Sequence, residues 1–247
     1  MPFRLFHSHM AGQTIGLALL ATLVFVTPGA AQDPSAPLPP ARPDATEAST
    51  QKNTPAEPEP GEQTTQQADS TGEACLERLR SLGLRFESQP PVEEDACRIE
   101  NPVSVSALPN NIDVTPESLM ECSLAEDVAQ WMGEVVTPEA ERHLQSAPTR
   151  LLIGTSYQCR AQRSGGKLSE HAFGNGIDVM GFNFDKRDPM VIRSHDEGSP
   201  EAAFQSAIRT GACPIFTTVL GPGSDYAHSD HLHLDSRERK GDYRICQ

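Results

Sequence analysis

Residues 32–72 contain eight prolines, a single large aliphatic residue (Leu38) and no aromatic residue. A segment of this composition cannot bury enough apolar surface to offset the conformational entropy lost on ordering. We therefore predict a disordered, partly polyproline-like tether over residues 32–72, with a net charge of −5. A plain linker is the simpler interpretation, and threading through a porous polymer or docking to a partner is the alternative. The remaining residues, 73–247, have a suitable length for one packed domain.

The segment before this tether has the layout of a secretory signal peptide. Arg4 precedes a short apolar stretch, residues 14–26, and small residues follow up to Ala31. The stretch is shorter than the roughly 20 residues of a membrane-spanning helix, and no longer apolar run exists elsewhere. We expect cleavage near Ala31 and export to the periplasm or the extracellular space, with an uncleaved N-terminal anchor as the alternative. No cysteine lies near the cleavage site, which argues against a lipoprotein anchor.

The charge of the chain limits the classes of molecule that we expect as its main binding partner. The net charge is −14, and residues 73–247 alone carry 17 basic and 27 acidic side chains. No block of basic residues is present. Nucleic acid and anionic membrane surfaces both require such a block, so we do not expect either as the main partner.

All six cysteines lie within residues 73–247. Because an exported chain meets an oxidising compartment, we predict three structural disulfides and no reactive thiol. No C-x-x-C spacing occurs, which argues against a zinc ribbon. Spacing alone leaves about 15 pairings open. The residues are Cys75, Cys97, Cys122, Cys159, Cys213 and Cys246.

The apolar patterns predict an α+β fold with a small antiparallel sheet, because helices and strands do not alternate as in βαβ units. We place one helix from Thr115-Pro116 to Trp131, since proline favours the first position of a helix. Gly83 is expected to end the first helix. The predicted helices are 73–82, 115–131, 138–145 and 201–209, and the predicted strands are 103–108, 151–156, 176–182 and 231–235.

A first polar cluster lies at residues 168–182. His171 and Asp178 are separated by Gly174 and Gly176, which allow a tight turn to bring the two side chains together. Asp178 lies within an apolar strand pattern, where an unpaired carboxylate would be costly to bury. A bound cation would neutralise it, and a buried ion pair with an arginine is the alternative.

A second cluster lies at residues 227–235. His231 and His233 are two apart, so on a strand they project from the same face. His228 and Asp230 lie just upstream. Together with His171 and Asp178, the H-x-H pair favours a metal site.

Such a His-Asp-His set leaves a fourth metal position open, which is typical of catalytic zinc. Zinc acidifies water and polarises a carbonyl oxygen, and a neighbouring base must then pass a proton to the leaving amine. His231, Asp230 and His228 are the candidate bases. No G-x-S-x-G motif, P-loop or dinucleotide-binding motif is present, which argues against serine hydrolase and nucleotide chemistry.

The pattern Ser169-x-His171-x-x-Gly174-x-x-x-Asp178 followed by His231-x-His233 resembles the signature of the LAS metallopeptidases. These include D-alanyl-D-alanine carboxypeptidases, peptidoglycan LD/DD-endopeptidases and the zinc-binding hedgehog domain. More narrowly, residues 75–247 resemble the bacterial extensin-like C-terminal domain family. That resemblance rests on the segments SYQCR (156–160), LSEHA (168–172), GAC (211–213), VLGPG (219–223) and DHLHLD (230–235).

The resemblance implies a disulfide-stapled fold of the hedgehog and D-Ala-D-Ala carboxypeptidase kind, with zinc held by His171, Asp178 and His233. His231 matches the general base of the endopeptidase branch. Carboxypeptidase relatives carry glutamate three residues before the last zinc ligand, where this chain has Asp230, so Asp230 is the second candidate base.

Two further active-site roles and the disulfide pairing follow from the same resemblance. His228 matches another endopeptidase histidine. Arg160 aligns with a polar residue that holds the substrate's carbonyl or carboxylate, and its alternative role is a salt bridge. The implied disulfides are Cys75–Cys97, Cys122–Cys159 and Cys213–Cys246.

We therefore expect a secreted zinc hydrolase of peptidoglycan peptides, of the DD- or LD-endopeptidase or carboxypeptidase type. A non-catalytic zinc-fold module that binds or scaffolds a cell-envelope component is the alternative, and a zinc amidase with a non-wall substrate is a third interpretation. The acidity of residues 73–247 disfavours anionic wall polymers as the target, which leaves the peptide part of the wall.

Overall fold

The computed structural model of the chain describes residues 72–163 and 165–247. The signal peptide predicted over residues 1–31 lies outside the described residues, as does the predicted tether up to residue 71. Gly72, which we assigned to the tether, belongs to a helix that covers residues 72–82. Within the described ranges, no helix is long and apolar enough to cross a membrane.

The described elements agree in kind with most of the predicted ones, with ends that differ by a few residues. The strands are β1 (Arg85–Ser88), β2 (Val92–Glu94), β3 (Cys97–Ile99), β4 (Pro102–Leu108), β5 (Ile112–Glu121), β6 (Pro148–Thr155), β7 (Gly176–Phe184), β8 (Met190–Val191), β9 (Thr218–Leu220), β10 (Leu232–Asp235) and β11 (Ile245–Cys246). The helical elements after residues 72–82 are η1 (Pro109–Asn111), α2 (Cys122–Trp131), η2 (Met132–Val136), α3 (Thr137–Leu144), η3 (Glu170–Phe173), α4 (Pro200–Ala212), η4 (Tyr226–His228) and η5 (Lys240–Asp242).

The described strands form one large mixed sheet and a separate β2–β3 hairpin. The large sheet has nine strands in the order β1-β4-β5-β6-β7-β10-β9-β11, with β8 paired to β7. The predicted α+β class is confirmed, but the prediction of a small antiparallel sheet was wrong. Two pairs, β5–β6 and β9–β11, are parallel. The first arises because α2, η2 and α3 carry the chain back over the sheet before β6 begins, as parallel neighbours require.

The predicted helix from Thr115 was also wrong in its first half. These residues extend β5, and α2 begins only at Cys122, whose N–H donates to the side chain of Glu121. Pro116 lies in an exposed stretch of β5, within the irregularity where the pairing with β4 skips residues. Proline occurs both at such strand irregularities and at the first position of a helix, because neither position requires a backbone N–H. The sequence alone therefore does not distinguish the two.

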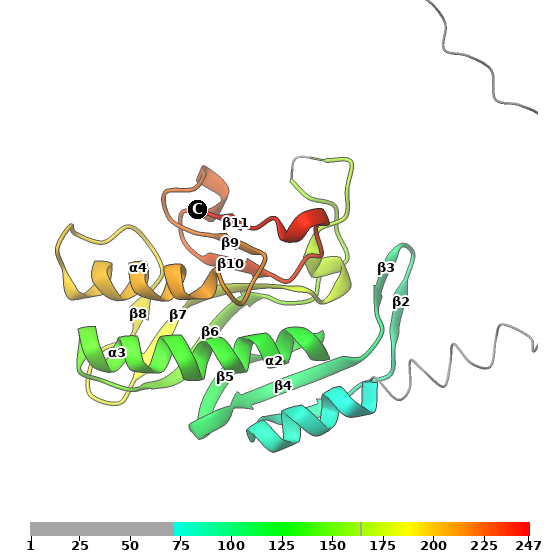
Figure 1. Cartoon of the computed structure of the whole chain (residues 1–247), viewed down its shortest axis with the longest axis horizontal. Helices are drawn as coiled ribbons and strands as arrows, with labels where there is room; N and C mark the ends of the chain where they lie inside the picture. Colours follow the sequence, from blue (N-terminus) through cyan, green and yellow to red (C-terminus); the bar gives the residue numbers. More distant parts are fainter. Residues whose placement is uncertain (1–71, 164) are drawn as a thin grey trace, which may run out of the picture. The chain divides into compact units, whose positions relative to one another are not determined.

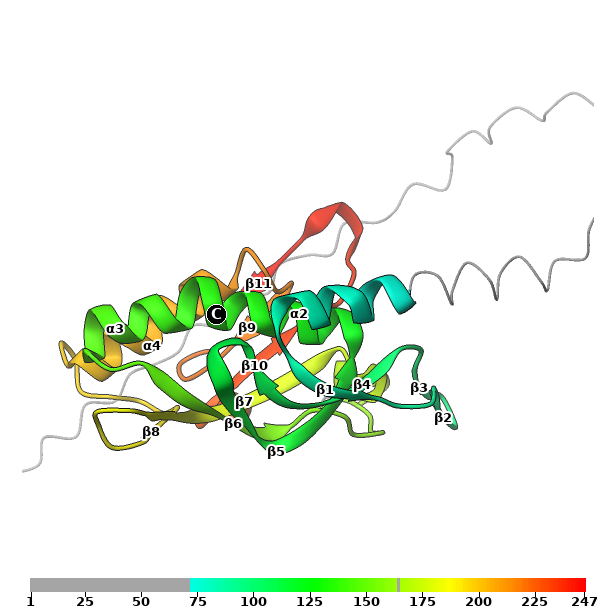
Figure 2. The ribbon, with the colours of Figure 1, turned by 90° about the horizontal axis from the view of Figure 1, so that it is seen from below.

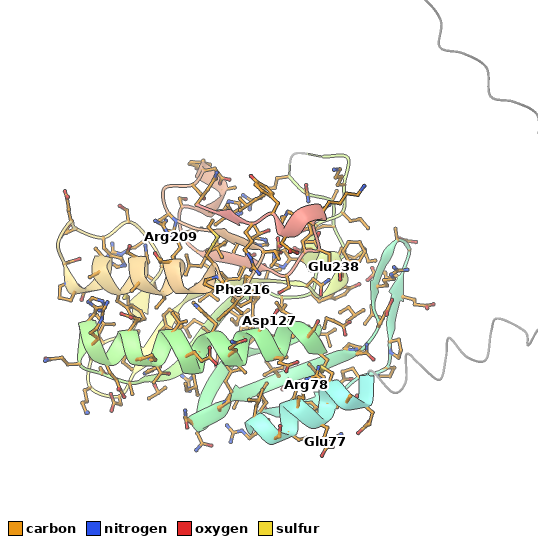
Figure 3. All side chains as sticks on the ribbon, viewed as in Figure 1. Glu77, Arg78, Asp127, Arg209, Phe216 and Glu238 are labelled. Atoms are coloured by element: carbon orange, nitrogen blue, oxygen red, sulfur yellow. A yellow bond between two sulfur atoms is a disulfide. The ribbon has the colours of Figure 1, made fainter. Side chains whose placement is uncertain are left out.

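The helices lie on one face of the sheet (Figures 1 and 2). The buried core joins apolar side chains of the helices to those of the sheet. Trp131 at the end of α2 is fully buried, and its ring lies 6.2 Å from that of Phe182 on β7 and 6.3 Å from that of Phe216. Its indole N–H donates to the carbonyl of Ile208 in α4 at 3.0 Å. On the outside of the layer, Arg78, labelled in Figure 3, ties the helix over residues 72–82 to α2 through Glu126.

All six cysteines form disulfides, as predicted, but two of the three implied pairings were wrong. Cys213–Cys246 is confirmed, whereas the other bonds are Cys75–Cys122 and Cys97–Cys159. Cys75 faces the start of α2 because its helix packs there, so its partner is not the next cysteine in the sequence. Cys97 lies on the β2–β3 hairpin, which reaches the loop after β6, where Tyr157 donates a hydrogen bond to Glu94.

Candidate metal centre

Two neighbouring strands place the candidate ligands on the face of the sheet that lies away from the helices. β7 buries Ile177 and Val179 in the core, so Asp178 between them projects from the opposite face. β10 alternates in the same way, and its register sets His233 directly opposite Asp178. Cross-strand neighbours on one face lie close enough for their side chains to interact.

The third candidate, His171, reaches Asp178 from η3. Its side chain is 1% exposed, and its Nδ1 lies 2.7 Å from the backbone carbonyl oxygen of Ser156. A carbonyl only accepts, so Nδ1 carries the proton and Nε2 presents a lone pair. That Nε2 lies 3.2 Å from Asp178 Oδ1, yet it is buried without a hydrogen-bond partner in the described part of the chain. A lone pair that faces a carboxylate oxygen in this way is satisfied by a cation.

His233 completes the group from the other side of Asp178. Its Nδ1 lies 2.9 Å from Asp178 Oδ1, and its Nε2 lies 3.1 Å from Asp235 Oδ2. Burial by itself lowers the pKa of His233. The hydrogen bonds to the carboxylates of Asp178 and Asp235 outweigh that effect and raise the pKa to about 9. Conversely, burial raises the pKa of Asp178, and the contacts with His171 and His233 lower it well below its usual value. The arrangement therefore requires positive charge between the two carboxylates, which a proton on His233 supplies when no metal is bound.

One ligand atom from each of His171, Asp178 and His233 lies within 4.8 Å of the others. Two imidazole nitrogens and one carboxylate oxygen form a donor set that suits zinc and leaves a fourth position free. Among the described residues, the ion-pair partners of Asp178 are histidines, so the alternative of a buried arginine pair does not apply there. The three predicted ligands thus come together at one point, in a geometry that fits a metal ion.

His231 lies beside this group with one nitrogen toward it. Its Nδ1 is 3.0 Å from Asp230 Oδ1, and its Nε2 is 3.6 Å from Asp178 Oδ1. The hydrogen bond from His231 lowers the pKa of Asp230, whose side chain is 72% exposed. A carboxylate at Nδ1 holds the proton there, so the Nε2 lone pair faces the centre. The group opens on a cleft of about 320 Å³, which Asp178, His231, Met180 and Tyr226 help to line.

Comparison with known families gives one match. The family model described as "Extensin-like protein C-terminus" matches residues 73–247. The chain belongs to this family. No curated protein and no solved structure matches it. The match covers every residue of the candidate centre, so the centre lies wholly within the extensin-like domain.

In this extensin-like domain, His228 extends the histidine cluster. It ends η4, and its Nδ1 lies 2.8 Å from Asp225 Oδ1. Its ring centre lies 5.2 Å from that of His231 and 5.7 Å from that of His233. Burial lowers the pKa of His228, although the hydrogen bond to Asp225 opposes that effect. The lowered pKa favours the neutral form of His228, which can accept a proton.

Arg160 does not line the cleft, and neither do His228 and the two histidines of the ligand group, whereas Asp178, Asp230 and His231 do. Its guanidinium donates to Gln158 Oε1 at 2.8 Å and to the carbonyl of Ala161 at 3.4 Å. The arginine that lines the cleft is Arg163. Among the described residues Arg160 forms no ion pair, so the alternative role in a salt bridge finds no support there, and its contact with substrate stays a prediction.

The sequence analysis did not identify two groups that contact the ligand histidines, the carboxylate of Asp235 and the backbone carbonyl of Ser156. Asp235 lies two residues after His233 on a strand, so the same alternation that paired His231 with His233 could have identified it. The Ser156 carbonyl that orients His171 belongs to the backbone, so no residue type signals it.

Proposed function

We propose that the extensin-like domain is a zinc-dependent peptidase that cleaves peptides of bacterial peptidoglycan, as a DD- or LD-endopeptidase or carboxypeptidase. The proposal includes a fold related to the hedgehog and D-Ala-D-Ala carboxypeptidase domains. The observation that carries it is the convergence of His171 Nε2 and His233 Nδ1 on Asp178 at the edge of a cleft. The buried, unpartnered nitrogen of His171 supports a cation there.

In this proposal His171, Asp178 and His233 hold the zinc ion. When bound, zinc supplies Lewis acidity, which makes water a nucleophile near neutral pH and polarises the scissile carbonyl. The protein's contribution is a fixed, largely buried ligand set, because all three side chains are at most 12% exposed.

His231 is the proposed base in preference to Asp230. Its Nε2 faces the ligand group, whereas the Asp230 carboxylate contacts the other nitrogen of the same ring. Asp230 thus orients His231, and Nε2 takes the proton of the attacking water and gives it to the leaving amine. A neutral His228 nearby offers a second acceptor.

The substrate class rests on two sequence properties, the resemblance to wall peptidases and the predicted export. The net charge of residues 73–247 also favours the peptide part of the wall over its anionic polymers.

Mass spectrometry of peptidoglycan fragments tests this proposal directly. The full chain loaded with zinc is expected to release peptide fragments, and His231→Gln is expected to retain zinc but lose at least 100-fold in rate. The control is His143→Gln, a histidine on α3 outside the cleft, which is expected to match the wild type.

One result would count against hydrolysis. A zinc-loaded chain that releases nothing, with His231→Gln indistinguishable from wild type, contradicts a peptidase. Retained binding to peptidoglycan in that case supports the alternative, a zinc-fold module that binds or scaffolds the cell envelope.

A further inference from the structure

Asp235 is a buried carboxylate directly behind His233, and the proposed reaction gives it no role. Only 4% of the residue is exposed. Its Oδ2 lies 3.1 Å from His233 Nε2, while its Oδ1 accepts from the hydroxyl of Thr218 at 2.6 Å and from the N–H of Arg237 at 3.2 Å. A buried carboxylate with this many donors is held in one orientation.

The position of Asp235 rules it out as a fourth ligand of the same ion. His233 contacts Asp178 through Nδ1 and Asp235 through Nε2, so the imidazole ring separates the two carboxylates. Any effect of Asp235 on the metal must pass through His233.

The two ligand histidines are oriented in opposite senses. In His171 the Nδ1–H donates to the Ser156 carbonyl, which leaves Nε2 toward Asp178. In His233 the contact with Asp235 occupies Nε2, which leaves Nδ1 toward Asp178. Both ring nitrogens thus face a carboxylate, but only Asp178 belongs to the proposed ligand set. An ion held there would replace the proton on Nδ1, while Asp235, on the far side of the ring, accepts from Nε2–H and retains the proton on that nitrogen.

We propose that Asp235 is a positioning residue that selects Nδ1 of His233 as the metal ligand and strengthens its bond to zinc through the carboxylate charge. The inference rests on the proposed function, because it presupposes a metal at this centre. Carboxylate partners of this kind fix the ring orientation of a ligand histidine and raise its basicity.

A second layer of contacts holds Asp235 itself. Thr218 stands opposite Asp235 in the pairing of β9 with β10. Its hydroxyl oxygen accepts from Arg239 at 2.6 Å, so its hydrogen is directed to Asp235, and Arg239 also donates to the carbonyl of Thr217. Arg239 thus orients the Thr218 hydroxyl, and that hydroxyl holds the Asp235 carboxylate in place.

Zinc affinity of the full chain, measured by competition with a chromophoric chelator, tests this role. Asp235→Ala is expected to bind zinc about 10- to 100-fold more weakly than the wild type. Asp235→Asn keeps an acceptor oxygen but loses the charge, so its loss is expected to be smaller. Asp127→Asn is the matched control, since Asp127 is partly buried and contacts Ser236 but no histidine, and we expect an affinity within about twofold of wild type.

A spectroscopic measurement separates positioning from simple destabilisation. With cadmium-113 bound to the chain carrying ¹⁵N-labelled histidines, the wild type is expected to show coupling to Nδ1 of His233 and to Nε2 of His171. In Asp235→Ala the His233 coupling is expected to disappear or to move to Nε2, while the His171 coupling stays.

Wild-type zinc affinity and an unchanged His233 coupling in both Asp235 variants would overturn the inference. If Asp235→Ala does not fold, Asp235→Asn and Thr218→Val, which removes the hydroxyl donor, carry the same test. A wild-type chain that binds no zinc refutes the proposed function itself, and that result is distinct from a zinc-binding chain that tolerates both substitutions.

Discussion

Removing the Cys97–Cys159 disulfide is expected to weaken both the fold and the metal centre, whereas removing Cys75–Cys122 is expected to weaken only the fold. Cys159 lies three residues after Ser156, whose carbonyl orients His171. The same loop is bound to η3 by the N–H of Gln158, which donates to the carbonyl of His171 at 3.1 Å. The disulfide ties this loop to the β2–β3 hairpin.

The two disulfides are matched in their expected effect on stability. The linked cysteines are 62 residues apart in Cys97–Cys159 and 47 apart in Cys75–Cys122. Because loop entropy depends on the logarithm of loop length, each bond is expected to contribute about 4 kcal/mol to the free energy of unfolding, with a difference of about 0.2 kcal/mol.

Paired cysteine-to-alanine variants of each bond allow the two effects to be measured separately. Urea denaturation of the metal-free chain gives the free energy of unfolding, and chelator competition gives the zinc affinity. The Cys97/Cys159 variant is expected to bind zinc about tenfold more weakly, as with other losses of support behind a ligand. The Cys75/Cys122 variant is expected to retain wild-type affinity at a similar loss of stability.

Equal zinc affinity in the two variants would refute this reasoning. It would mean that the backbone hydrogen bonds between the loop and η3 suffice to hold the Ser156 carbonyl in place.

Three further predictions concern single residues. Asp178→Ala is expected to abolish stoichiometric zinc binding, and elemental analysis that still finds one zinc per chain contradicts the ligand assignment. Burial raises the pKa of Asp127 above its ordinary 3.8, although Ser236 opposes this, so the native state loses stability as the pH rises through that raised pKa. Asp127→Asn is therefore expected to be more stable than wild type at pH 7, with a gain that shrinks below about pH 4, and a gain that does not change with pH would contradict it. Trp131→Phe removes the indole N–H that donates to the Ile208 carbonyl and is expected to cost about 1 kcal/mol in thermal or urea unfolding, while an unchanged midpoint would show that the bond is dispensable.

Local patterns predicted the parts of the site that depend on neighbouring residues. The alternation of β7 and β10 and the Gly-rich turn before Asp178 are short-range properties, so they identified His171, Asp178, His231 and His233 as a group. The same reasoning failed at Pro116, because the local signal for a helix start also fits an irregular strand. Whether β5 continued as a strand depended on its pairing with β4 and β6, which are distant in sequence.

The sequence by itself determined the residue types of the centre, the α+β class and the existence of three disulfides, because each follows from composition or from spacing along the chain. Only the tertiary structure decided the mixed order of the sheet and the pairings of Cys75 and Cys97. It also placed Asp235 behind His233 and the Ser156 carbonyl behind His171. These features depend on which distant segments pack together, and packing is a property of the whole core rather than of any local pattern.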